Sequence, residues 1–316
     1  MTALLLIGGL AALLAGGELF VRSAAALALR LGLSPLVIGM TVVGFGTSLP
    51  ELVTSVEASL SGAPGIALGN VLGSNIANIL LILGLASLLA PIAVPPGALR
   101  TDGLALAAAT GVAVVVVAND MLTRPAGAAL IGALVAYTLV SLRGSARHGA
   151  SVPAEAAADP RPTAGRALDI RLALGLAVGL LLVLVGAQAL VSGALSIAVA
   201  AGLSEAFLGV TLVAVGTSLP ELVTSVLAAR NRQSALALGN ILGSNIFNLM
   251  GILGAAAVIA PFTVPAELAG RELWIMCAAT AALLGVMATG RLSRVTGLVF
   301  LAAYGGFLAL AVAALP

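Results

Sequence analysis

Two glutamates are the first candidates for chemistry, because each directly follows a proline inside an apolar stretch. Glu51 and Glu221 both lie in the string GTSLPELVTSV, at 46–56 and 216–226. In a helix, such a proline removes the donor for the carbonyl four residues earlier. The residues three and four before each glutamate share its helix face, and they carry hydroxyls: Thr47, Ser48, Thr217 and Ser218. Carboxylate, hydroxyl and freed carbonyl oxygens are hard donors, which suit Ca²⁺ or Na⁺ and bind soft metals poorly.

A second polar cluster follows each glutamate, in the strings GNVLGSNIAN at 69–78 and GNILGSNIFN at 239–248. In each string a serine and an asparagine four residues apart face the same neighbour: Ser74 with Asn78, and Ser244 with Asn248. Such side chains often only join helices, and Asn70 and Asn240 fit that structural alternative. For the others, the recurrence of the whole set in one register favours an ion site. With the two glutamates they could supply the roughly six to eight oxygens that Ca²⁺ takes.

The elements that must carry these residues are membrane helices. Of the 316 residues, 61% are hydrophobic and only 8% charged, with a mean hydropathy of +1.20, whereas soluble domains have about 25% charged residues. This excludes a soluble enzyme, a nucleic-acid-binding protein and a secreted module. Breaks at proline, glycine and arginine predict an all-α polytopic membrane protein with about ten transmembrane helices. They fall near 3–29, 36–60, 66–90, 102–118, 125–142, 170–200, 206–229, 235–260, 272–289 and 294–315.

The chain is an internal duplication. Residues 39–84 match 209–254 without a gap at an offset of 170, with 28 identities in 46 positions. Each half contains five predicted spans, an odd number, so the second half must enter the bilayer from the opposite side. Inverted repeats of this kind are typical of secondary transporters, which bind substrate near the bilayer midplane where the repeats meet. We therefore predict a first repeat at 1–142, a linker loop at 143–169 and a second repeat at 170–316.

Arginine placement predicts the orientation in the membrane. If the N-terminus lies outside, 12 of the 14 basic residues fall on the cytoplasmic side, and only Arg124 and Arg271 lie outside. The positive-inside rule favours that orientation. We expect both termini to lie outside the cell membrane and the 143–169 loop to be cytoplasmic.

The doubled GTSLPE and GNxxGSNIxN strings resemble the repeats of the cation/Ca²⁺ exchanger superfamily, most closely its bacterial and archaeal sodium/calcium exchanger branch. The resemblance covers nearly the whole chain. It implies ten helices and exchange of Ca²⁺ against Na⁺ by alternating access. It also implies that the first and sixth helices, here 3–29 and 170–200, slide across a core made by the other eight.

The resemblance also implies roles for individual residues. Glu51 and Glu221 match the central carboxylates shared by Ca²⁺ and Na⁺, and the backbone oxygens of Thr47 and Thr217 complete the Ca²⁺ site. The flanking Na⁺ sites take Ser48, Ser74, Ser218 and Ser244, with the carbonyls of Gly44 and Ala214. Asn78 and Asn248 match the remaining central positions. Some relatives have Asp at the position of Asn248, and the neutral amide here argues against K⁺ co-transport and leaves the Na⁺ stoichiometry open.

Three alternatives remain at this point. A Ca²⁺/H⁺ antiporter would use the same scaffold with protons replacing Na⁺ on the glutamates, although the neighbouring Ser, Thr and Asn oxygens favour Na⁺. A cation channel is disfavoured, because channels place the pore on an axis normal to the membrane. An intramembrane protease is disfavoured because the only histidine, His148, lies in the loop. We expect no enzymatic activity, no cofactor besides the transported ions and no obligate protein partner.

One further acid has an apparent partner. Glu18 lies four residues before Arg22, a spacing that favours an ion pair on one helix face. This predicts a structural or gating role for Glu18 rather than ion ligation.

Overall fold

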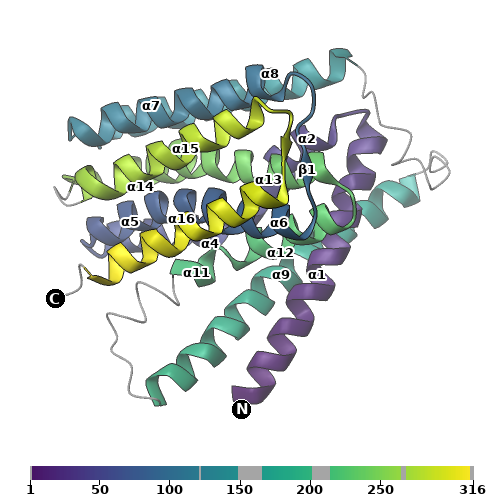
Figure 1. Ribbon diagram of the computed structural model, residues 1–316, viewed down its shortest axis with the longest axis horizontal. Coiled ribbons are helices and arrows are strands. Elements are labelled where there is room, and N and C mark those ends of the chain that lie inside the picture. Colours follow the sequence, from purple (N-terminus) through teal and green to yellow (C-terminus); the bar gives the residue numbers. More distant parts are fainter. Residues whose placement is uncertain (1, 121, 149–165, 201–213, 265–267, 314–316) are drawn as a thin grey trace.

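The computed structural model describes residues 2–120, 122–148, 166–200, 214–264 and 268–313, which are almost all helical (Figure 1). The first half contains α1 (Thr2–Leu31), α2 (Pro35–Ile38), η1 (Gly39–Val43), α3 (Gly44–Thr47), α4 (Leu49–Leu60), α5 (Pro64–Ala77), η2 (Asn78–Leu83), α6 (Gly84–Leu89), β1 (Ile92–Ala93), η3 (Leu99–Gly103), α7 (Leu104–Ala118) and α8 (Arg124–His148). The second half contains α9 (Arg166–Ala200), α11 (Ala214–Thr217), α12 (Leu219–Arg230), α13 (Ser234–Ile246), η6 (Phe247–Ile252), α14 (Leu253–Ile259), η7 (Leu268–Glu272), α15 (Leu273–Met287), β2 (Arg291–Leu292) and α16 (Arg294–Ala313). Elements marked η are short π-helices, and each of them continues directly into an α-helix.

The helices confirm the prediction of an all-α polytopic membrane protein. Eight helices of the described residues are long and apolar enough to cross a membrane, and the bent pair Pro35–Thr47 and Leu49–Leu60 would make a ninth span. These nine correspond to nine of the ten predicted spans. The remaining prediction, 206–229, lies partly outside the described residues, and its described part is helical in α11 and α12.

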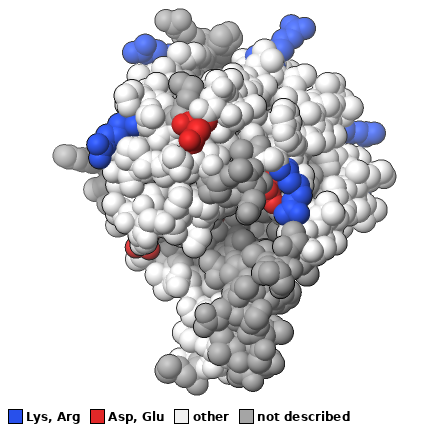
Figure 2. Space-filling view, turned by 90° about the vertical axis from the view of Figure 1, so that its left-hand side faces the viewer, with Lys and Arg blue, Asp and Glu red and all other residues white. Residues whose placement is uncertain are grey.

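Polar and apolar side chains are distributed as a lipid environment requires. Large apolar side chains are exposed on the outer helices, for example Leu4 at 76%, Val140 at 68% and Val295 at 69%. Among the described residues on the face shown in Figure 2, charged side chains are few and scattered. The interior, by contrast, holds a set of fully buried hydroxyl, amide and carboxyl groups. Such a wide apolar exterior is expected of a surface in contact with lipid.

The predicted span 36–60 is not one straight helix. It breaks at Ser48, where α3 ends and α4 begins, and the two parts meet at an angle of 46°. Pro50 lies in the first turn of α4, where a proline fits because the N–H groups of that turn lack helical partners anyway. The second half repeats this arrangement with Ser218 and Pro220 at the start of α12. The proline therefore starts a new helix segment at each glutamate.

The long helices α1 and α9 pack against each other along glycines. A Cβ added at Gly9 would meet the carbonyl of Gly186 at 2.9 Å, and one added at Gly16 would meet the carbonyl of Gly179 at 2.9 Å. Positions that rise along α1 meet positions that fall along α9, so the two helices run antiparallel, side by side at the lower edge of Figure 1. Glycine at these contacts lets the two backbones approach closely.

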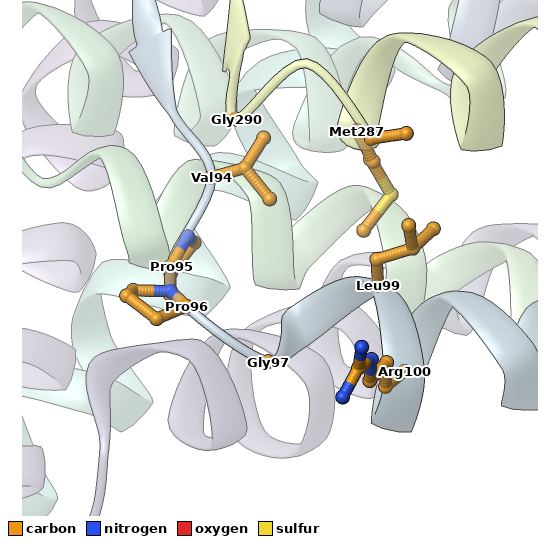
Figure 3. A pocket seen from close by; sticks show the side chains of 9 residues that line it. Val94, Pro95, Pro96, Gly97, Leu99, Arg100, Met287 and Gly290 are labelled. Atoms are coloured by element: carbon orange, nitrogen blue, oxygen red, sulfur yellow. The ribbon is translucent and has the colours of Figure 1, made fainter.

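The loops of the two halves meet at the two ends of the helix bundle. β1 pairs with β2 in antiparallel register, with Ile92 opposite Leu292. Elsewhere, the N–H of Phe262 donates to the carbonyl of Leu122 at 3.3 Å. A cavity of about 300 Å³ lies next to the strand pair, and Arg100 is the one charged side chain among the residues that line it (Figure 3). None of the predicted site residues lines this cavity.

Candidate ion-binding site

The two glutamates are linked across the halves by their serines. The hydroxyl of Ser48 donates to Glu221 Oε1 at 2.7 Å, and the hydroxyl of Ser218 donates to Glu51 Oε1 at 3.1 Å. The two bonds are related by the offset of the duplication. Both carboxyl groups are completely buried, with 1% and 0% of the residue exposed. The sequence places Ser48 on the same helix face as Glu51, whereas in the structure its hydroxyl bonds to the glutamate of the other half.

The breaks in the two spans place each carboxyl group at a helix start. Glu51 lies in the first turn of α4 and Glu221 in the first turn of α12. The unpaired N–H groups and the dipole of a helix N-terminus favour a negative charge there. The local fold thus partly compensates each carboxylate without supplying a positively charged side chain.

Among the residues that the structure describes, no basic side chain pairs with either of the two glutamates. The ion pairs formed within the described ranges join Arg22 to Glu18 and Arg271 to Glu272. Over the same residues, no three His, Cys, Asp or Glu side chains group closely enough to hold a metal ion by themselves. An unpaired buried carboxylate is very unfavourable. A site with two of them, lined by neutral oxygens, is suited to a cation that carries the balancing charge.

The amides of the second motif are buried as completely as the two glutamates. The side-chain NH₂ of Asn78 donates to Asn245 Oδ1 at 3.0 Å, which joins the two halves again. Asn78, Asn245 and Asn248 are each no more than 1% exposed. Asn78 starts the π-helix η2, and Asn248 lies in the matching π-helix η6. π-helical turns occur often at functional sites, and the sequence contained no signal that predicted them.

Several of these buried oxygens have no hydrogen-bond donor among the described residues. Four of them belong to the central positions that the sequence singled out, namely Glu51 Oε2, Glu221 Oε2, Asn78 Oδ1 and Asn248 Oδ1, and the Oδ1 of Asn75 in the same motif is also without a donor. The amide nitrogen of Asn248 is also without a partner there. A buried polar atom without a partner costs about 1–3 kcal/mol. Carboxylate and amide oxygens are the kind of atom that a hard cation such as Ca²⁺ takes as ligands.

The flanking residues whose burial the structure describes are buried or half-buried. The hydroxyl of Ser244 donates to the carbonyl of Gly44 at 3.2 Å, so that α13 of the second half contacts α3 of the first. The hydroxyl of Thr47 donates to the carbonyl of Val43 at 3.1 Å. The backbone carbonyl is the other oxygen of Thr47, and it is the one that the sequence predicts as a Ca²⁺ ligand. Ser74 is 3% exposed. Thr217 is half-buried, and Ala214 is the first residue of α11.

Two asparagines hold the glutamate-bearing helices in place. Asn70 donates to the backbone carbonyl of Glu51 at 3.0 Å and to the hydroxyl of Ser55 at 2.9 Å. Asn240 donates to the hydroxyl of Ser225 at 2.8 Å, at the matching position of the second half. Their amides therefore join α5 to α4 and α13 to α12, as the structural alternative predicted.

Glu18 lies in a separate polar contact. Arg22 Nε lies 2.6 Å from Glu18 Oε1, as the spacing predicted, and Asn231 donates to Glu18 Oε2 at 3.0 Å. The second contact joins α1 to the end of α12, and it was not predicted. Neither contact involves one of the residues predicted to bind Ca²⁺ or Na⁺.

Three comparisons identify what the chain resembles. The family model described as sodium/calcium exchanger protein matches residues 1–143 and 171–313. The chain is 39% identical over 306 residues to a putative antiporter, CaxA, of Alkalimonas amylolytica, covering 95% of each chain. It is 33% identical to the sodium/calcium exchanger MaX1 of Methanosarcina acetivorans, covering 96% of this chain and 97% of the relative.

The solved structures agree with the sequence matches. The structure superposes with a TM-score of 0.84 on the sodium-calcium exchanger NCX_Mj soaked with Na⁺ and Ca²⁺, at 31% identity, covering 100% of this chain and 98% of the other. Both repeats, with the glutamate motif of each, fall within the matched residues. The chain therefore belongs to the sodium/calcium exchanger family.

Proposed function

We propose that this membrane antiporter exchanges Ca²⁺ for Na⁺ by alternating access, with both ions competing for one site built on Glu51 and Glu221. Family membership makes the chain a cation/Ca²⁺ antiporter and not an enzyme. One observation carries the finer proposal. The two buried carboxyl groups each keep an oxygen without a donor and have no basic partner among the described residues.

Charge balance supports competition between the ions. Two carboxylates neutralise one Ca²⁺, so a Ca²⁺ ion and a full load of Na⁺ cannot both use Glu51 and Glu221 at once. A transporter that changes its open side only when one load is bound then exchanges one ion for the other. Mutual exclusion at the two glutamates is what couples the fluxes.

The surrounding oxygens divide into two groups in this proposal. The carboxylates, the Thr47 and Thr217 carbonyls and the amides of Asn78 and Asn248 surround Ca²⁺. The flanking Na⁺ positions take the hydroxyls and carbonyls of Ser48, Ser74, Ser218, Ser244, Gly44 and Ala214. The contact between Ser244 and Gly44 supports a flanking position where the two halves meet. Asn248 brings no charge, so we propose no K⁺ site.

The packing supports the proposed motion. α1 and α9 contact each other closely at glycines, with larger side chains such as Leu13 and Val183 packed between them, so they form one pair that can move together over the remaining helices. The loop contacts support inverted repeats. The β1–β2 pair and the Phe262–Leu122 bond join loops that ten alternating crossings place on the same side. We place both termini outside the cell membrane and the 143–169 loop in the cytoplasm.

Transport by everted membrane vesicles tests the proposal. Vesicles that contain the protein are loaded with Ca²⁺, and Ca²⁺ movement is driven either by a Na⁺ gradient or by a pH gradient of equal size. We expect saturable Ca²⁺ flux that requires Na⁺ on the opposite side. Flux driven by the pH gradient alone would identify a Ca²⁺/H⁺ antiporter, and non-saturable flux without a counter-ion would identify a channel.

A further inference from the structure

A buried acid that is not one of the predicted Ca²⁺ or Na⁺ ligands lies where η3 meets α8. Asp102 is 5% exposed, and it forms no ion pair within the part of the chain that the structure describes. Its carboxylate accepts two hydroxyl bonds instead: from Thr101 at 2.7 Å and from Tyr137 of α8 at 3.2 Å. A buried carboxylate whose side-chain partners are two hydroxyl groups holds those groups firmly, because the loss of either would leave it with fewer donors than a buried charge needs.

Tyr137 connects this acid to the broken span. Its hydroxyl also lies 3.2 Å from the sulfur of Met40, which is 1% exposed and belongs to the π-helix η1. The hydroxyl has one proton, and the carboxylate is the stronger acceptor. Asp102 therefore orients Tyr137, and the oxygen of Tyr137 is left against the Met40 side chain.

The backbone of η1 leads directly to the ion site. The backbone atoms of Met40 lie so close to Gly243 of α13 that a Cβ there would overlap the Met40 carbonyl. The residue after Gly243 is Ser244, whose hydroxyl bonds to the carbonyl of Gly44, the first residue after η1. A shift of Met40 would thus move the Gly44 carbonyl relative to Ser244.

α8 supports this segment at a second point. Ser145 accepts a hydrogen bond at 2.8 Å from the N–H of Ser34, the residue that caps α2. Ser145 and Tyr137 are eight positions apart on one helix, or about 12 Å at 1.5 Å per residue. α8 therefore holds both the start of the broken span and its π-helical turn.

The second half lacks this arrangement. The positions that match Asp102 and Tyr137 at the offset of 170 are Glu272 and Phe307. Glu272 pairs with Arg271 at 2.7 Å, and Phe307 contacts the ring of Tyr304. The contact is therefore specific to the first half, and a phenyl ring is compatible with this position of the fold.

We propose that Tyr137, held by Asp102, is a positioning residue that fixes η1 and so sets the Na⁺ affinity of the Gly44–Ser244 side of the site. This inference rests on the proposed function. Because η1 adjoins Gly44 rather than the glutamates, loss of the contact should weaken Na⁺ binding more than Ca²⁺ binding. A residue with only a structural role would not separate the two ions.

The test is Tyr137→Phe, measured as Na⁺-driven Ca²⁺ flux in proteoliposomes with purified protein. We expect the half-saturating Na⁺ concentration to rise by about threefold to tenfold, the range for the loss of one ordinary hydrogen bond. The half-saturating Ca²⁺ concentration and the maximal rate should stay within about twofold. Thr138→Val is the matched control, because the Thr138 hydroxyl bonds only within its own helix, to Leu134 at 2.8 Å.

Variants of Asp102 complete the test. Asp102→Asn keeps an oxygen that can accept from Tyr137 and should retain the wild-type Na⁺ dependence. Asp102→Leu should raise the half-saturating Na⁺ concentration as Tyr137→Phe does, and the double variant should be no worse than either single variant. Unchanged Na⁺ dependence in Tyr137→Phe, or equal weakening for both ions, would overturn the inference. Absence of Na⁺-driven flux in the wild-type protein would instead overturn the proposed function.

Discussion

Ser48 donates its hydrogen bond to Glu221, 173 positions later in the chain, and not to the glutamate three residues away on its own helix. Ser218 forms the reciprocal bond to Glu51. Each half therefore supplies a hydrogen-bond donor to the carboxylate of the other half. A conformational change that moves the helix break at Ser48 away from the break at Ser218 would remove a hydrogen bond from both carboxylates at once. The ion load is thereby linked to the relative position of the two halves.

Glu51→Gln or Glu221→Gln should abolish Ca²⁺ transport while the protein still folds. Loss of one charged ligand from a buried site costs about 3–5 kcal/mol, which corresponds to a loss of at least about 100-fold. The amide keeps the size of the side chain and removes a buried like charge, so thermal stability in detergent should not fall. Glu57→Gln is the control, because Glu57 lies on the same helix and is exposed. Exchange at a near-normal rate in either site variant would refute the site.

Gly243→Ala should be strongly destabilising, whereas Gly73→Ala should be tolerated. The two glycines occupy the same place in the duplicated motif. A Cβ at Gly243 would overlap the backbone of Met40, and one at Gly73 would meet nothing within 4 Å. Overpacking against backbone costs about 1–3 kcal/mol or more. Protein yield and the thermal midpoint of both purified variants give the comparison, and equal effects would contradict the close approach of α13 to η1.

Asn248→Asp should fold better than Asn78→Asp, although the two positions also match. The NH₂ group of Asn78 donates to Asn245, and an aspartate would lose this bond and place a carboxylate against the Asn245 oxygen. The nitrogen of Asn248 has no such partner in the described structure. The expected difference is about 1–3 kcal/mol, and denaturation of both variants measures it.

Asn248→Asp should also make Ca²⁺ transport more sensitive to pH. A third carboxylate in one buried site binds protons as well as cations, so protons compete more strongly with Ca²⁺. Uptake by the variant should fall steeply between about pH 8 and pH 6, and uptake by the wild type should change less. Superimposable pH profiles would mean that residue 248 lies apart from the two glutamates.

Labelling of introduced cysteines tests the orientation. In a background with Cys277→Ala, a cysteine at 151 should react with an impermeant reagent only from the cytoplasmic side, and Ser61→Cys only from outside. Ser61 is the better choice in its loop, because the neighbouring Gly62 has a φ of +71° that other residues adopt rarely. Reaction of both cysteines from the same side would contradict the inverted repeats.

The sequence by itself determined the parts of this protein that depend on local chemistry. Apolar runs of span length require membrane helices, Pro50 and Pro220 each remove the donor for a backbone carbonyl near a glutamate, and the duplication places equivalent oxygens in both halves. The division into 1–142, 143–169 and 170–316 remains a prediction of that kind. All of these follow from properties that a residue has together with its near neighbours along the chain.

Only the tertiary structure decided how the two halves meet. Matching positions of the two motifs have different surroundings. Gly243 lies against backbone and Gly73 in open space, and the amide nitrogen of Asn78 forms a hydrogen bond whereas that of Asn248 has no partner in the described structure. The crossing of Ser48 to Glu221, the π-helical turns and the contact of Tyr137 with Asp102 were likewise absent from any sequence pattern. The physical reason is that packing and hydrogen bonding between distant segments depend on distances and directions in space, and a repeated string of residues does not specify which partners it will face.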